Sequence, residues 1–286
     1  MNLLRAQSRP LDSMLGHQFP VHNLGHVRVI DYMGDDNAIV QMARVSYGEG
    51  TKTVNEDRGL IRYLMAHRHT SPFEGCVVKL HLKMPIFVAR QWVRHRTASM
   101  NEYSGRYSEM KDECYLPDLD YILAQSKTNK QGSAGELDQE FKERFREVFE
   151  NDQKEIFSHY KEAIVMDVAR EMARINLPLS TYTEFYWQMN LHNLLHFCSL
   201  RSDPHAQREI RDFSDIILHE IIKAWVPHTY EAFMEYVMNA QSFSATELSI
   251  MKDMLAGEVY EPQQLPSWAN LSKREQEAFL KKVAKT

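Results

Sequence analysis

The sequence predicts an α/β protein of the α+β type, in which a central antiparallel or mixed sheet is packed by helices. Residues 76–83 alternate apolar and polar side chains, and residues 181–189 are rich in Thr, Tyr, Phe and Trp, as in strands. Other segments repeat apolar residues at helical spacing. The chain has 286 residues, 43% of them hydrophobic, which supplies a sizeable core. The absence of an internal repeat argues against a solenoid or propeller.

The first predicted elements follow Gly25. A short strand is expected over 27–32, a turn at 34–36 and a helix over 38–45. A second helix is expected over 55–67, because its apolar residues fall at helical spacing. The stretch 69–73 should interrupt that helix, since Pro72 disfavours the helical conformation of the residue before it.

The strand expected over 76–83 should be half-buried. Its apolar face carries Cys76, Val78, Leu80 and Leu82, and its polar face carries Lys79, His81 and Lys83. Pro85 then opens a predicted helix over 86–95. Helices over 157–174 and 204–224 should flank the second strand, 181–189.

Composition excludes several classes of protein. The 34 Lys and Arg against 39 Asp and Glu give a net charge of −5, so no global positive field attracts nucleic acid or anionic lipid. The three cysteines lack CxxC spacing, which disfavours a disulfide framework or cysteine zinc site and favours a reducing compartment. No apolar stretch has the length of a signal peptide or a membrane span. A soluble cytoplasmic protein is expected.

A local cationic segment stands out in this acidic chain. Between Arg90 and Arg106 there are four arginines and one glutamate, a local charge of +3. Arginine can hold two phosphate oxygens at once, and Ser99 to Gly105 reads as a polar loop that can close around a ligand. The alternative is a solvated helix end in which cations favour the negative end of the dipole.

The order of these residues resembles the signature of the flavin-dependent thymidylate synthases, RHRxxSxNExSxRY, which is met at every fixed position from Arg94 to Tyr107. Similar segments run from about Gly25 to about Tyr236. The expected organisation is therefore an N-terminal extension (1–24), the synthase domain (25–236) with an exposed polar insertion (125–135), and a helical C-terminal extension (237–286). In that extension, Ser244 with Glu247 and Ser272 with Glu275 look like capping boxes that start two helices.

The resemblance implies where the ligands bind. The expected dUMP-binding residues are Gln91, Trp92, Val93, Arg94, Glu102, Tyr103, Ser104, Gly105, Arg106, Arg174 and Arg201. The expected FAD-binding residues are Ser71, Arg94, His95, Arg96, Glu102, Asn190, Leu191, His192 and His196. Ser71 would reach the cofactor from a neighbouring subunit of a homotetramer. Ser71 and His196 depart from the threonine and asparagine common there, but both can still form hydrogen bonds.

The implied reaction is methylation of dUMP to dTMP. Methylenetetrahydrofolate would donate the carbon, and FAD reduced by NADPH would supply the hydride. Uracil C5 becomes a nucleophile if charge can build on N3–C4–O4, and Arg201 is the catalytic candidate that would stabilise this charge. Classical thymidylate synthases use a cysteine, but Cys198 lacks their Pro-Cys-His context and is expected to be a core thiol. Ser104 has no neighbouring base in sequence and is expected to bind ligand.

Two other readings compete with this one. His192, His196 and His205 have partial zinc spacing, but no HExxH glutamate lies between them, so no metal is expected. An RNA- or nucleotide-binding module without catalysis would use the signature arginines with Trp92 and Tyr103 as stacking surfaces. Such a module should bind oligonucleotides with a steep salt dependence, whereas the enzyme should prefer free dUMP and purify yellow.

Overall fold

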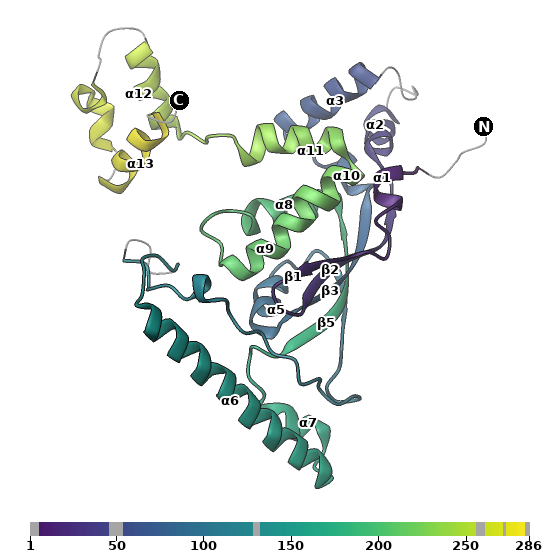
Figure 1. Cartoon of the computed structure of the whole chain (residues 1–286). Coiled ribbons are helices and arrows are strands. Elements are labelled where there is room, and N and C mark those ends of the chain that lie inside the picture. The colour runs from purple at the N-terminus through teal and green to yellow at the C-terminus, as the bar shows by residue number, and fades with distance from the viewer. Residues whose placement is uncertain (1–5, 46–53, 128–131, 256–260, 271–272, 284–286) are drawn as a thin grey trace. The chain divides into compact units, whose positions relative to one another are not determined.

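The computed structural model describes residues 6–45, 54–127, 132–255, 261–270 and 273–283 (Figure 1). The chain divides into two compact units, Met1–Phe233 and Met234–Thr286. Within the described ranges, no helix is both long and apolar enough to cross a membrane.

The first unit is built on a five-stranded sheet in the order β1-β2-β3-β5-β4. All four strand pairings are antiparallel, which decides between the two predicted sheet types. The strands are β1 (Gln18–Val21), β2 (Gly25–Met33), β3 (Val77–Pro85), β4 (Ser99–Glu102) and β5 (Tyr182–Asn190). The strands predicted at 27–32, 76–83 and 181–189 are confirmed as β2, β3 and β5.

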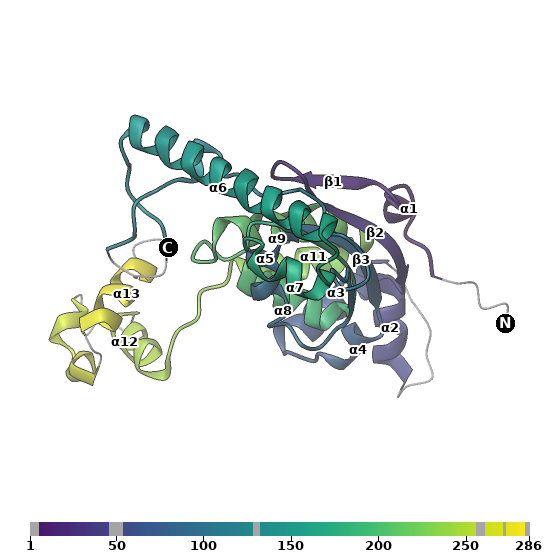
Figure 2. The same cartoon turned by 90° about the horizontal axis from the view of Figure 1, so that it is seen from below.

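One face of the sheet forms the core. Val78, Leu80 and Leu82 of β3 are fully buried there, as their alternation predicts. Helices α5 (Ile86–Trp92), α8 (Leu191–Arg201) and α9 (Arg208–Ile216) pack on the sheet. Figure 2 shows β1 and β2 to one side of these helices. The aromatic members of the core that contact Trp92 are Phe185, Trp187, Phe197 and Phe213.

The prediction of a half-buried β3 is wrong at its polar face. His81 and Lys83 keep only 8% and 9% of their surface exposed. Lys83 pairs with Glu113 at 2.9 Å, and the ring of His81 lies between Arg28 and Glu184. These polar residues are buried because each has a charged or hydrogen-bonding partner.

Short helices connect and cover the strands. They are α1 (Arg9–Asp12), α2 (Asp36–Arg44), α3 (Val54–Ala66), α4 (Ser71–Glu74), α7 (Arg170–Ala173), α10 (Lys223–Trp225) and α11 (Pro227–Phe233). Helices α2 and α3 confirm the predictions at 38–45 and 55–67. Asp35 caps α2 by accepting a hydrogen bond from the Ala38 amide. The predicted break after α3 is present, and the single turn α4 follows it.

Three predicted boundaries are wrong. The helix placed at 157–174 is α6 (Gln139–Val165), which begins where Asp138 caps the amides of Glu140 and Phe141. The helix placed at 204–224 begins at Arg208 and continues through a π-helical segment, Ile217–Ile222, into α10. The helix placed at 86–95 ends at Trp92.

The second unit has its own small core of Ile250, Leu265 and Phe279. Its helices are α12 (Ala245–Leu255) and α13 (Lys273–Val283), with 3₁₀ turns at Pro262–Gln264 and Pro266–Asn270 between them. The capping box of Ser244 with Glu247 is confirmed, because the side chain of each residue accepts a hydrogen bond from the backbone amide of the other. The second predicted box includes Ser272, which lies outside the described residues.

Candidate functional site

The signature segment is anchored by Trp92. This side chain ends α5 and is fully buried among aromatic rings, including Phe197 of α8 at 4.4 Å between centroids. Arg94 and Arg96 follow immediately and are exposed. The buried ring therefore fixes the position at which the arginines leave the core. Trp92 is itself a predicted dUMP-binding residue, but the whole residue, backbone included, is 0% exposed.

Arg201 and His95 are brought together across 106 residues of sequence. The Nε of Arg201 donates to Nε2 of His95 at 2.9 Å, and a second guanidinium nitrogen donates to the Gln91 carbonyl at 3.2 Å. A guanidinium only donates hydrogen bonds, so Nε2 of His95 must be the acceptor and unprotonated. The neutral ring therefore carries its proton on Nδ1. Burial, followed by the charge of Arg201, lowers the pKa of His95 to about 4.

The predicted loop at Ser99–Gly105 instead begins as a strand. Ser99–Glu102 forms β4, which pairs with the edge of β5 and places Glu102 opposite Phe185. The Tyr103 amide continues this pairing by donating to the Glu184 carbonyl at 2.8 Å. The signature residues after Glu102 therefore leave a defined sheet edge.

Gly105 lets the signature approach Arg174 closely. A Cβ at Gly105 would lie 3.1 Å from Cδ and 3.3 Å from a terminal nitrogen of Arg174, and 2.6 Å from the sulfur of Met110. These distances are shorter than ordinary contacts, so any larger residue would displace the side chains of Met110 and Arg174 from these positions. Two predicted nucleotide-binding residues thus lie side by side.

Hydrogen bonds hold three further signature residues. Arg106 donates from Nε to the Glu171 carboxylate at 3.0 Å, in a pair that is largely exposed. Glu102 accepts a hydrogen bond from the hydroxyl of Thr183 at 2.7 Å. Ser104 accepts from the Arg106 amide at 3.3 Å.

Four of the residues predicted for flavin lie on α8 or at its N-cap. Asn190 caps this helix by accepting from the Asn193 amide at 2.9 Å. Leu191 is fully buried, while His192 is partly exposed and His196 is exposed. Ser71 begins α4, which packs against α8.

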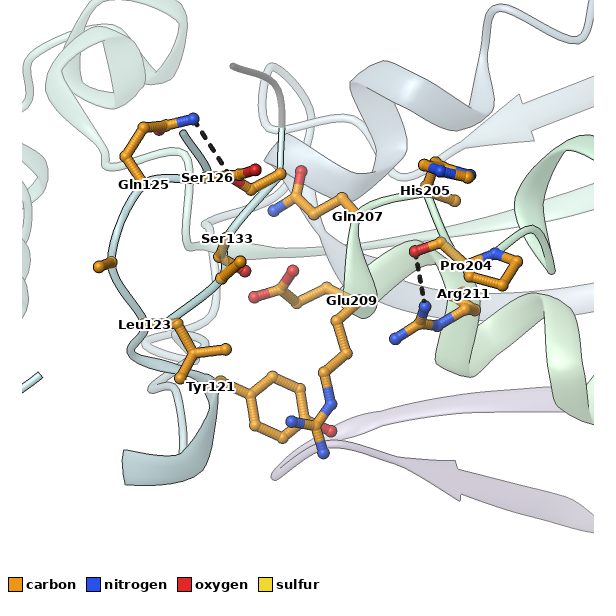
Figure 3. Close-up of a pocket in the computed structure, with 15 residues that line it drawn as sticks. Tyr121, Leu123, Gln125, Ser126, Ser133, Pro204, His205, Gln207, Glu209 and Arg211 are labelled. Carbon is orange, nitrogen blue, oxygen red and sulfur yellow. Dashed lines mark hydrogen bonds between the residues drawn. The ribbon is translucent and has the colours of Figure 1, made fainter. Parts of the chain in front are cut away.

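A polar cavity that the sequence did not predict adjoins this site (Figure 3). Its volume is about 750 Å³, and it lies between the hairpin of the insertion and the first turn of α9. Gln207 lines the cavity and accepts a hydrogen bond from the side chain of Gln91. Arg208 stacks over Tyr121 at 3.6 Å. The segment Asp-Pro-His-Ala-Gln, residues 203–207, was the feature of the sequence that could have indicated this wall of the cavity.

The competing chemistries have little structural support. Cys198 is fully buried, and burial raises the pKa of its thiol to about 12, as expected of a core thiol. Among the described residues, no three His, Cys, Asp or Glu side chains are grouped in a way that would hold a metal ion.

Comparison with known proteins defines the class. Residues 28–228 match the family described as thymidylate synthase complementing protein. The chain is 49% identical to the flavin-dependent thymidylate synthase of Rickettsia conorii over 95% of both chains. It is 50% identical to the enzyme of that name from Gluconobacter oxydans, over 94% of this chain and 89% of the relative.

A solved structure agrees with this class. The UMP/dUMP methylase PolB from Streptomyces cacaoi, bound with 5-Br dUMP, superposes with a TM-score of 0.69 and 33% identity, over 77% of this chain and 98% of that one. The relatives and the fold thus define a methyltransferase that depends on a flavin. The chain belongs to the flavin-dependent thymidylate synthase family.

Proposed function

We propose that the chain converts dUMP to dTMP with FAD as its flavin, methylenetetrahydrofolate as the carbon donor and NADPH as the reductant. The observation that carries the proposal is the joining of the signature to Arg201 through His95 and Gln91. Gln91 is expected to contact dUMP and His95 to contact FAD, so these bonds join residues of both expected binding sets to the residue expected to activate the base.

The cations of the site fit anionic ligands. Arg94 and Arg96 are exposed, and among the described residues neither forms an ion pair with a carboxylate. They are therefore available for the phosphates of FAD or dUMP. Arg174 packs close to Gly105, and Arg106 follows Gly105 directly in the proposed nucleotide-binding segment. Ser71, Asn190, Leu191, His192 and His196 are proposed to contact the flavin.

Arg201 has the catalytic role in this proposal. Its guanidinium would stabilise the negative charge on the uracil N3–C4–O4 system while C5 attacks the one-carbon unit. The bonds to His95 and Gln91 fix its direction before substrate binds, so little reorganisation accompanies the reaction. The reduced flavin, when bound, supplies the hydride that completes the methyl group.

Self-association is proposed from the exposed apolar surface of α6 and its continuation. Phe141, Phe145 and Val148 expose 54%, 44% and 51% of their surface, and Val165, Met166, Met172 and Ile175 extend this apolar exposure. Such a surface supports association with further copies of the chain. The number proposed, a homotetramer in which one subunit completes its neighbour's site, is what the family resemblance implies. A cytoplasmic location is proposed because Cys76, Cys114 and Cys198 are unpaired thiols.

The test is anaerobic. The purified protein receives NADPH, dUMP and methylenetetrahydrofolate, and dTMP is quantified by chromatography. Wild type should form dTMP, Arg201→Ala should keep its flavin and lose most dTMP formation, and Lys252→Ala at an exposed position of α12 should match wild type. A wild-type protein that forms no dTMP refutes the proposed function.

A further inference from the structure

Thr183 is a buried polar residue on the core face of β5. It keeps 3% of its surface exposed and stands in line with Phe185, Trp187 and Met189, at the period of two that marks one face of a strand. An apolar residue is expected at such a position. The hydroxyl of Thr183 therefore requires a partner there.

That partner is the carboxylate of Glu102. The two side chains share a face of the sheet, since Glu102 pairs with Phe185 and Thr183 lies two residues before Phe185. The Thr183 Oγ1 lies 2.7 Å from Oε1 of Glu102. An ionised carboxylate only accepts, so the threonine donates in a short, charge-assisted hydrogen bond.

The contact reaches from the core to the exposed signature. Glu102 is exposed, and Tyr103 and the remaining signature residues follow it directly. Threonine is stiff at its first side-chain torsion because it is β-branched. Its hydroxyl is held by the buried strand, so it can fix one carboxylate oxygen and leave the other for a ligand donor.

We propose that Thr183 is a positioning residue, which aims the Glu102 carboxylate at a hydrogen-bond donor of the bound nucleotide or flavin. The inference rests on the proposed function of the site. It predicts that Thr183 acts on the ligand only through Glu102. A residue that merely filled the core would instead act through stability.

The variants separate these two roles. Thr183→Val keeps the shape and removes the donor, while Thr183→Ser keeps the donor. Thr181→Val is the matched control, because Thr181 is also buried but its hydroxyl lies near Cys114 at 3.9 Å. Each variant is made in wild type, and Thr183→Val is also combined with Glu102→Ala, which removes the acceptor oxygens. The measurements are kcat/KM for dUMP, flavin content and thermal unfolding.

Thr183→Val should lower kcat/KM about tenfold, as for the loss of a hydrogen bond to a charged group. Thr183→Ser and Thr181→Val should stay within about twofold of wild type, and the Thr183→Val effect should vanish in the Glu102→Ala background, which has no acceptor. An undiminished effect in that background, an equal loss in Thr181→Val, or full activity of Thr183→Val overturns the inference.

Hydrogen exchange provides a readout that does not require turnover. The amides of Tyr103 to Tyr107 should exchange faster in Thr183→Val than in Thr181→Val, because the signature loses its tie to β5. If wild type forms no dTMP, the proposed function fails, while equal exchange in the two variants refutes the tie itself. The two failures are therefore distinguishable.

Discussion

Replacing Arg201 by glutamine should raise the pKa of His95. The two side chains meet at 2.9 Å between Arg201 Nε and His95 Nε2. Three causes lower the pKa of His95 to about 4, in the order burial, the charge of Arg201 and the charge of His196. Glutamine removes the second cause and leaves the first and third in place.

The size of the change follows from Coulomb's law. Two unit charges about 4 Å apart interact by roughly 1 kcal/mol in water and roughly 4 kcal/mol at an effective dielectric constant of about 20. Arg201 and His95 are both partly exposed, so the lower end of this range applies. One pKa unit corresponds to about 1.4 kcal/mol. The pKa of His95 should therefore rise from about 4 to about 5 in Arg201→Gln.

Proton NMR measures this pKa directly. The His95 ring resonance is assigned by comparison with His95→Gln and titrated between about pH 2.5 and pH 8, so that both midpoints fall inside the range. Arg201→Lys is the control, because it keeps a positive charge and should keep a pKa below that of Arg201→Gln. A folded Arg201→Gln protein whose His95 midpoint equals that of wild type would refute the coupling.

Three further predictions follow from the described contacts. Gly105→Ala should raise KM for dUMP about tenfold, because the added Cβ would lie 3.1 Å from Cδ of Arg174 and displace that side chain. Steady-state kinetics measures KM, and an unchanged KM contradicts the prediction. Asp36→Ala should lower the free energy of unfolding by about 2–4 kcal/mol, since the buried carboxylate of Asp36 accepts hydrogen bonds from the His228 and Thr229 amides and from the Thr229 hydroxyl. Denaturant titration measures this loss, with Asp36→Asn as the comparison variant, and a loss below about 1 kcal/mol contradicts the prediction. The free energy of unfolding should fall as pH drops from about 6.5 towards 4, because burial and the charge of His81 lower the pKa of His26 to about 4 and the unfolded chain therefore binds more protons in this window. His26→Gln should make the plot of unfolding free energy against pH less steep, and an unchanged slope refutes the assignment.

Sequence patterning predicted the strands with one apolar face. Residues 27–32, 76–83 and 181–189 alternate or are rich in β-forming side chains, and their positions are confirmed. Strand β4 was missed because Ser99–Glu102 is largely polar and has no apolar face of its own. It forms because the edge of β5 supplies hydrogen-bonding partners, and such pairing is not encoded locally.

The long helix α6 was misplaced for a related reason. Its first half carries Phe141 and Phe145 on an exposed side, so burial does not mark its beginning. The cap at Asp138 was the readable signal. At the other end, the helix stops at Val165, and Asp167 has a positive φ of 62°. The expectation of a helix through Arg174 ignored this turn.

Resemblance to the family identified the residues of the candidate site, but it did not identify the hydrogen bonds between them. The signature identified Arg94 to Tyr107, and related segments identified Arg174 and Arg201. The bonds from Arg201 to His95 and from Thr183 to Glu102 join residues 106 and 81 positions apart. Period-two reasoning does offer one clue, since Thr183 is a polar residue on an apolar face of β5.

The aromatic core explains why these distant groups meet. Phe197 contacts Trp92 at 4.4 Å and the ring of His95 at 4.8 Å between centroids. It also lies one helical turn before Arg201 on α8, so its packing sets the position of that guanidinium. One buried ring thus positions the cation and its acceptor together. The geometry of the site is fixed by packing before any ligand arrives, which is the arrangement that electrostatic stabilisation of a reacting base requires.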